Sequence, residues 1–248
     1  MILTFNERLS DSPFVERVWS SQSVTSGAFV SVAVSHWEMV VSRYEGKMTV
    51  TVRGPETKAT MAHCPSDGEW VGIRFKLGTS LRQLSAKSLV DGAVNLPEAA
   101  SKGFWLHSSA WQFPTYDNAE IFVDRLVRDG LLWREPVVDA ALQGQLEHQL
   151  KDLSLRSVQR RFLQATGLTH GAVRQIERAR HATLLLKQGV SILDTVDQAG
   201  YADQPHLTRS LKHLIGQTPA QMMGKGEPQQ LSFLFNTCLL YTSDAADE

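Results

Sequence analysis

Two groups of hydrogen-bonding side chains recur at helical spacing in the last hundred residues. Arg156, Gln159 and Arg160 stand at positions i, i+3 and i+4, so a helix places them on one face. The guanidinium fork of arginine matches O6 and N7 of guanine, and the amide of glutamine matches adenine in the same way. The chemistry predicted here is therefore recognition of base edges in a DNA major groove.

The helix that carries this first group is predicted between Ser154 as N-cap and Gly167 as terminator. Its inner stripe is predicted from four apolar residues, Leu155, Val158, Phe162 and Ala165. Leu146 and Leu150 of the preceding helix should pack beneath it, although Asp152 stands at the corner without the usual glycine.

The second group follows a clearer helix-turn-helix pattern. Ser191 and Asp194 form a predicted capping box, Gly200 ends that helix, and Asp203 caps the next. The inner positions of the second helix are Leu207, Leu211, Leu214 and Ile215, and its outer positions are His206, Arg209, Lys212 and His213. Gly216 is predicted to end it, and Pro219 to prevent its resumption.

A long helix, from Val173 to Gln188, is predicted between the two groups, with Arg174, Arg178 and Lys187 outside. A rigid connection of this kind would hold two recognition helices in successive major grooves, about 34 Å apart. Residues 151–219 hold 10 Lys and Arg against 5 Asp and Glu, although the whole chain has a net charge of −1. A basic block of this kind favours a polyanionic partner, and a solvated helix face is the alternative.

This arrangement resembles the DNA-binding domain of AraC/XylS-type transcription regulators. The resemblance covers residues 136–222 and rests on four segments: SVQRRF, ERARHATLLL, AGYADQPHLTRSLKHLIG and QTPAQ. It implies base-facing positions at Arg156, Gln159, Arg160, Pro205, His206, Thr208 and Arg209. Lys212 is expected to contact phosphate, and Thr195 stands where the family usually keeps an apolar residue.

The N-terminal half has a different composition. All six tryptophans precede residue 135, and residues 14–78 alternate like strands between Gly and Pro turns. An amphipathic helix is predicted at 118–133. We therefore expect an α+β domain at 1–135, with an antiparallel barrel or sandwich, followed by an all-α tandem helix-turn-helix domain at 136–222.

The resemblance implies that residues 1–135 bind an effector or mediate dimerisation. Trp37, Trp70, Trp105 and Trp111 are assigned to the core, with an apolar ligand pocket as the alternative. His36, Glu38 and His63 lack the spacing of a cupin metal cluster, so no metal is expected. Cys64 is expected to be buried and inert, rather than a reactive thiol.

The predicted partner is double-stranded promoter DNA, and a small-molecule effector and a homodimer stay open. No run of about 18 apolar residues and no signal peptide is present, so we expect a cytoplasmic protein without membrane contact. Known catalytic motifs are absent from the sequence, so neither an enzyme nor a cofactor is expected. The alternatives are an enzyme built on the N-terminal domain and a non-DNA interaction protein with degenerate helix-turn-helix units.

The C-terminal end is treated separately from the fold. Residues 223–237 are expected to be a tail. Residues 238–248, CLLYTSDAADE, resemble the translation of a transposon adapter used for sequencing libraries. We interpret them as read-through, with a genuine acidic tail as the alternative.

Overall fold

The computed structural model describes residues 3–99, 102–143 and 153–224. The chain forms two compact units, each made of separated segments. The first comprises Met1–Ser26, Ser35–Pro55 and Pro65–Val173, and the second comprises Gly27–Val34, Glu56–Cys64 and Arg174–Glu248. Along the chain, the two compact units do not meet near residue 136. The domain boundary predicted there therefore stays a prediction.

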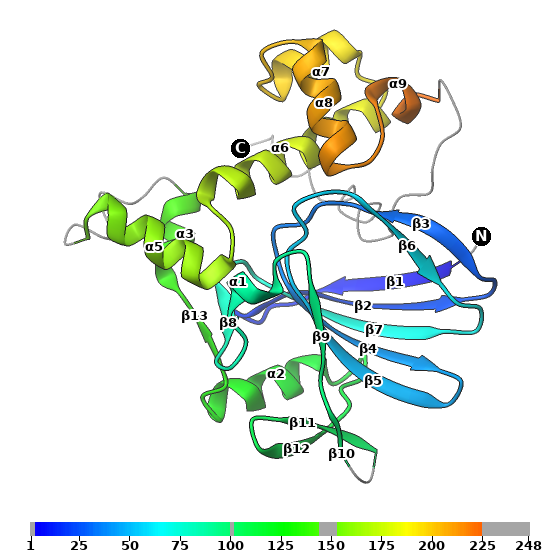
Figure 1. Ribbon diagram of the computed structural model, residues 1–248, viewed down its shortest axis with the longest axis vertical. Helices are drawn as coiled ribbons and strands as arrows, with labels where there is room; N and C mark the ends of the chain where they lie inside the picture. Colours follow the sequence, from blue (N-terminus) through cyan, green and yellow to red (C-terminus); the bar gives the residue numbers. More distant parts are fainter. Residues whose placement is uncertain (1–2, 100–101, 144–152, 225–248) are drawn as a thin grey trace. The chain divides into compact units, whose positions relative to one another are not determined.

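A six-stranded antiparallel sheet forms the centre of the first unit (Figure 1). Its strands, in spatial order, are β1 (Leu3–Leu9), β2 (Val15–Ser23), β7 (Glu69–Phe75), β4 (Glu38–Tyr44), β5 (Lys47–Arg53) and β9 (Ala93–Asn95). Glu45 and Gly46 join β4 to β5 with φ values of 50° and 75°. Two consecutive positive φ values suit a two-residue hairpin whose twist matches the flanking strands.

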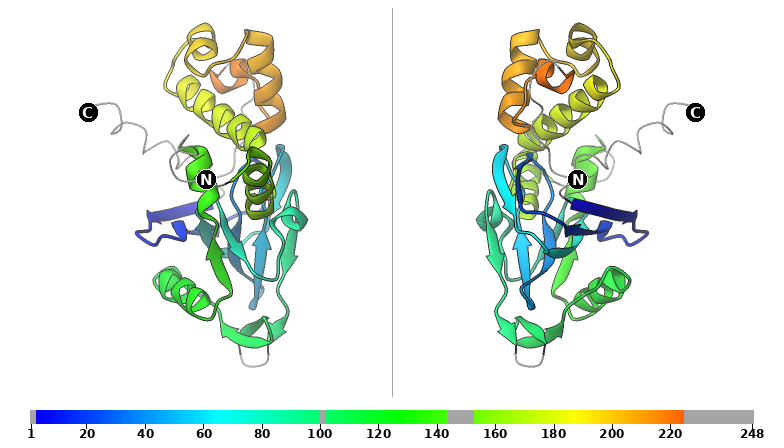
Figure 2. Two further views of the ribbon diagram at one scale, coloured as in Figure 1. Left: turned by 90° about the vertical axis from the view of Figure 1, so that its left-hand side faces the viewer. Right: turned by 90° about the vertical axis from the view of Figure 1, so that its right-hand side faces the viewer.

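One layer over this sheet combines a helix and a small sheet. The helix is α2 (Ala119–Arg128), and the sheet contains β10 (Glu98–Ala99), β11 (Gly103–Leu106) and β12 (Ser109–Gln112). The Trp111 ring meets Phe122 edge-on with centroids 5.7 Å apart, and the Arg125 guanidinium lies 4.7 Å from the centroid of the Trp111 ring. Figure 2 shows α2 beside the β11–β12 hairpin from two further sides. These contacts join the layer to one hydrophobic core with the sheet.

The helix predicted at 118–133 is shorter than expected. Gly130 has a φ of +67° just after α2 ends, and residues beyond it form β13 (Leu132–Arg134), paired with β8 (Thr79–Leu81). The apolar spacing of Leu132 therefore belongs to a strand. A positive φ at glycine turns the chain out of the helix, which periodicity alone does not reveal.

The described residues of the first unit also form α1 (Ala86–Leu89), α3 (Pro136–Leu142) and α5 (Leu155–Thr166). The described N-terminal residues contain no closed barrel, and their open antiparallel sheets fit the sandwich form of the prediction. The described C-terminal residues are helical, as predicted.

The second unit contains a two-stranded ribbon and helices. The strands are β3 (Gly27–Ser31) and β6 (Thr60–Cys64), which pair antiparallel. The helices are α6 (His170–Lys187), which begins just before this unit, α7 (Ile192–Gln198), α8 (Gln204–Leu214) and α9 (Pro219–Met222). Among the described residues, none of the helices is long and apolar enough to cross a membrane.

Candidate nucleic-acid interface

Helix α5 begins and ends where its caps predict. The Ser154 hydroxyl accepts a hydrogen bond from the Ser157 amide at 3.3 Å, and Gly167 terminates the helix with a φ of +74°. Val158, Phe162 and Ala165 are buried, together with Thr166. Because the cap and the terminating glycine act within one turn, both helix bounds could be read from the sequence.

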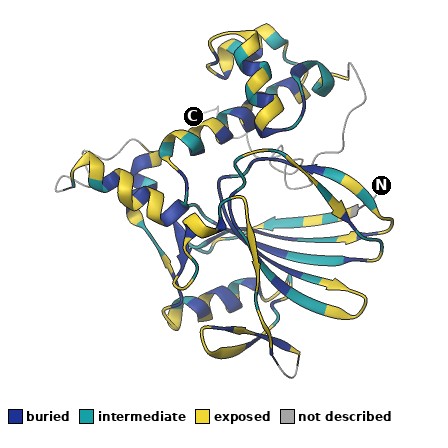
Figure 3. Cartoon of the chain, in the orientation of Figure 1, coloured by how far each residue is buried: buried dark blue, intermediate teal, exposed yellow. Residues whose placement is uncertain are grey.

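The opposite face of α5 is exposed. Arg156, Gln159 and Arg160 are all exposed, and Figure 3 shows the exposed colour alternating with buried positions along this helix. Their shared face allows all three side chains to reach one surface. Their contact with bases stays a prediction.

Leu155 was wrongly placed on the inner stripe. It is the first residue of α5, and 72% of its surface is exposed. The buried stripe begins one turn later, at Val158. An exposed leucine therefore lies beside the polar group at the start of this helix. Its position directly after the N-cap was the sequence signal that could have indicated its exposure.

Helix α5 rests on elements from the N-terminal half, within the first unit. The Ser80 hydroxyl in β8 donates to the Ala165 carbonyl at 3.1 Å. A Cβ at Gly167 would lie 2.6 Å from the Ala86 carbonyl oxygen in α1, so this glycine is required by close packing as well as by its φ. The expected contacts of Leu146 and Leu150, and the corner at Asp152, lie outside the described residues.

The second helix-turn-helix pair has the predicted N-caps, but the capping box predicted for Ser191 and Asp194 is incomplete, because the Asp194 carboxylate accepts from the Ser191 hydroxyl and not from its amide. Ser191 accepts a hydrogen bond from the Asp194 amide at 3.1 Å, and Gly200 leaves α7 with a φ of +69°. Asp203 accepts from the His206 amide at 2.6 Å. The predicted inner residues of α8 are all buried, namely Leu207, Leu211, Leu214 and Ile215.

Helix α8 does not resume at Pro219, as predicted, but a separate short helix that the sequence analysis did not expect begins there. This residue opens α9 as its first residue, behind a capping box between Thr218 and Gln221. A proline at the first helical position lacks only an N–H that the helix would not use there.

The predicted contact residues of α8 divide by exposure. Arg209 and Lys212 are exposed, whereas His206 and Thr208 are half-buried. The His206 ring meets the Tyr201 ring edge-on, with centroids 5.1 Å apart. The Lys212 ammonium donates to the Gly216 carbonyl at 3.5 Å, a distance at which the side chain is weakly held and can turn toward another acceptor.

Arg178 has a structural role that the sequence interpretation missed. It was placed on the outer side of the linker helix, but its guanidinium lies 4.5 Å from the centroid of the Tyr201 ring and donates to the Gly200 carbonyl at 3.2 Å. Arg178 therefore ties α6 to the corner of the second helix-turn-helix pair. Its aromatic partner is 23 positions away, so helical periodicity carried no sign of it.

Thr195 in α7 is fully buried, and its hydroxyl lacks a hydrogen-bond partner among the described residues. We expect Thr195→Val to raise the free energy of unfolding by about 1 kcal/mol, because it removes an unsatisfied buried hydroxyl and keeps the branched shape. Urea unfolding followed by far-ultraviolet circular dichroism measures this change.

Thr183 provides the matched control for that variant. It is equally buried, but its hydroxyl donates to the Ala179 carbonyl at 2.8 Å. Thr183→Val should therefore bring no gain in stability. A loss of stability in Thr195→Val would show that its hydroxyl is satisfied.

The three residues considered for a metal site divide between the two units, with His36 and Glu38 in the first and His63 in the second. His36 and Glu38 are buried, His63 is exposed on β6, and Glu38 accepts a hydrogen bond from the Trp19 indole at 3.2 Å. No group of three His, Cys, Asp or Glu that could hold a metal occurs among the residues described. Cys64 is buried, as predicted.

The four tryptophans assigned to the core differ in burial. Trp37 stacks on Phe75 with centroids 4.0 Å apart, and Trp111 is buried against α2. Trp70 is half-buried and Trp105 is exposed. The core assignment therefore holds for Trp37 and Trp111 and is wrong for Trp105.

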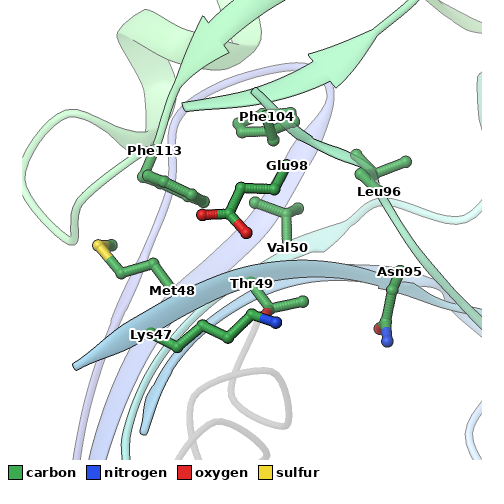
Figure 4. Close-up of a pocket in the computed structure, with 9 residues that line it drawn as sticks. All are labelled: Lys47, Met48, Thr49, Val50, Asn95, Leu96, Glu98, Phe104 and Phe113. Atoms are coloured by element: carbon green, nitrogen blue, oxygen red, sulfur yellow. The ribbon is translucent and has the colours of Figure 1, made fainter. Parts of the chain in front are cut away.

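One small pocket lies in the first unit beside β5 and β9. It has a volume of about 180 Å³, with an apolar floor that includes Val50, Phe104 and Phe113. Figure 4 shows the Glu98 carboxylate extending between these side chains. This volume is below the ~300 Å³ at which ligand pockets usually begin. The pocket therefore does not identify an effector.

Comparison with known proteins finds one related family. Residues 151–225 match a family described as a helix-turn-helix domain. This match covers α5 to α9 and includes every residue predicted to contact DNA. No curated protein and no solved structure matches the chain.

Proposed function

We propose that this chain, in which residues 151–225 are a helix-turn-helix domain of the AraC type, is a sequence-specific transcription regulator that reads two adjacent major grooves. Helix α5 is the first reader and α8 is the second. Arg156, Gln159 and Arg160 contact bases from α5, and His206, Thr208 and Arg209 contact them from α8. Lys212 binds phosphate.

The match at residues 151–225 carries this proposal. Two physical observations support it. Each reader buries one apolar stripe and leaves hydrogen-bonding side chains on the other face, as a helix in a groove requires. Residues 151–219 also have a net charge of +5, which favours the phosphate backbone.

A binding selection from random-sequence DNA tests the function directly. The full chain should enrich sites with two half-sites about one helical turn apart. Binding to the enriched DNA should weaken steeply as salt rises, because phosphate contacts release counterions. If no sequence is enriched over the starting pool, the proposal is wrong.

Exposed Leu155 should contribute to the first reader's specificity. An apolar side chain beside the polar group can contact the C5-methyl group of thymine, which distinguishes thymine from the other bases. We expect replacement of one thymine by deoxyuridine in the α5 half-site to weaken binding by about 0.8 kcal/mol, since one methyl contact is lost. Competition binding with thymine-to-deoxyuridine probes measures it.

Replacing that thymine by deoxyuridine should not change the affinity of the Leu155→Ala variant, because this variant has already lost the contact with the methyl group. Leu193→Ala is the matched control, because Leu193 is 70% exposed but lies on α7. That variant should keep the full sensitivity to deoxyuridine. Equal sensitivity in Leu155→Ala and the wild type would exclude a role for Leu155 in reading thymine.

A further inference from the structure

The second reader shares its compact unit with two strands from the N-terminal half. In β3 and β6, Gly27 stands opposite Cys64 and Ser31 opposite Thr60. The pairing continues to a bridge between Val34 and Glu56. We call residues 27–34 and 56–64 the β3–β6 ribbon. It belongs to the unit that also contains residues 174 onward.

The ribbon donates main-chain hydrogen bonds to the end of α8. The Ala33 amide donates to the Leu214 carbonyl at 2.7 Å, and the Ala59 amide donates to the His213 carbonyl at 2.9 Å. The last four carbonyls of a helix have no partner inside that helix. The ribbon therefore satisfies two acceptors that α8 cannot satisfy itself. Figure 1 shows the ribbon next to this end of α8.

Side-chain packing also joins the β3–β6 ribbon to the C-terminal end of α8. Gly216 follows α8 with a φ of +83°, and a Cβ there would lie 2.9 Å from Cγ1 of Val30 and 3.2 Å from Cβ of Ala59. Val30, Ala33 and Ile215 are buried. The ribbon and the helix end are thus in direct contact, and this glycine is needed both for the turn and for the close approach.

The ribbon's main-chain hydrogen bonds fall on the C-terminal end of α8. These bonds reach His213 and Leu214, whereas the proposed base contacts begin at His206. Recognition helices present mainly their N-terminal residues to base edges. The contacts of the ribbon with α8 are therefore compatible with entry of the N-terminal part of α8 into a groove.

We infer that the β3–β6 ribbon is the positioning element of the second reader, because it fixes the C-terminal end of α8. Reading of one half-site by α8 requires the ribbon. Reading by α5 does not, because α5 packs on β8 and α1 in the first unit. This inference rests on the proposed function. It makes the second reader a composite of chain segments from both halves of the sequence.

Footprinting of Ala59→Pro in the full chain tests the inference. Proline removes the amide that donates to His213, and Ala59→Ser keeps it. On DNA selected by the wild type, both the wild type and Ala59→Ser should protect two half-sites. Ala59→Pro should protect only the α5 half-site. The Arg160→Ala variant identifies that half-site, because Arg160 lies on α5. The affinity of Ala59→Pro for the selected DNA should fall by about tenfold or more. It should then equal the affinity of the wild type for DNA in which the α8 half-site is scrambled.

A second variant pair tests the side-chain contact. Val30→Asp places a charge at the buried junction, whereas Met61→Asp places it at the paired position of the ribbon, where 58% of the residue is exposed. Val30→Asp should lose the α8 half-site, and Met61→Asp should keep it. This pair decides the question if Ala59→Pro cannot be purified.

Tryptophan fluorescence provides the folding control. All six tryptophans belong to the first unit, so unchanged emission shows that this unit is intact in each variant. Protection of both half-sites by Ala59→Pro and Val30→Asp would overturn the inference, as would equal loss of both half-sites. If the wild type gives no sequence-dependent footprint, the proposed function fails and the inference fails with it. A failure of the inference alone leaves the wild-type footprint intact.

Discussion

Phe162→Ala is expected to lower the free energy of unfolding of the first unit by about 3–5 kcal/mol. Phe162 is 1% exposed in the centre of α5, and its ring meets the His170 ring with centroids 5.4 Å apart. Truncation loses the transfer free energy of the ring and leaves a cavity that the surrounding helices fill only in part. The first reader should therefore lose its support.

Urea unfolding followed by tryptophan fluorescence measures this loss selectively, since every tryptophan lies in the first unit. Leu163→Ala is the matched control, because Leu163 is the next residue of α5 but is 37% exposed. It should change stability by about 0.5 kcal/mol or less, as surface substitutions usually do. Similar losses in both variants would show that α5 is not packed through Phe162.

Arg160→Ala is expected to weaken binding to the selected DNA by about 1–3 kcal/mol, and to abolish the preference at one base pair. Arg160 is exposed on the face that also carries Arg156 and Gln159. A guanidinium that donates two hydrogen bonds to guanine cannot be replaced by a methyl group, so guanine loses its advantage at that position. A repeated selection with the variant measures both changes.

Arg161→Ala removes the same charge from the neighbouring exposed position and provides the control. At 3.6 residues per turn, Arg161 lies about 140° around the helix from Arg156 and about 160° from Gln159, so it does not share the reading face. Its loss should weaken binding to all sequences alike, as expected for a phosphate contact. If the two variants give the same base preferences as the wild type, Arg160 does not read a base.

The N-terminal half was predictable only in outline. The alternation between Gly and Pro turns in residues 14–78 indicated strands, and β4 and β5 are two of them, joined by a turn at Gly46. The amphipathic spacing at 118–133 correctly indicated α2 but extended it into β13, because Leu132 satisfies helical spacing and strand pairing equally well. The pairing order of the six-stranded sheet depends on contacts between distant strands, which local patterns do not specify.

The limits of the two reader helices were determined by the sequence itself. Ser154, Gly167, Asp203 and Gly216 act through hydrogen bonds and backbone angles within a few residues, so their types state where each helix begins and ends. Tertiary structure alone decided what holds those helices. The bond from Ala33 to Leu214 and the packing of Gly216 on Val30 join residues more than 180 positions apart. Such contacts form only where folding brings distant backbones together, and main-chain donors leave no mark in the residue types that supply them.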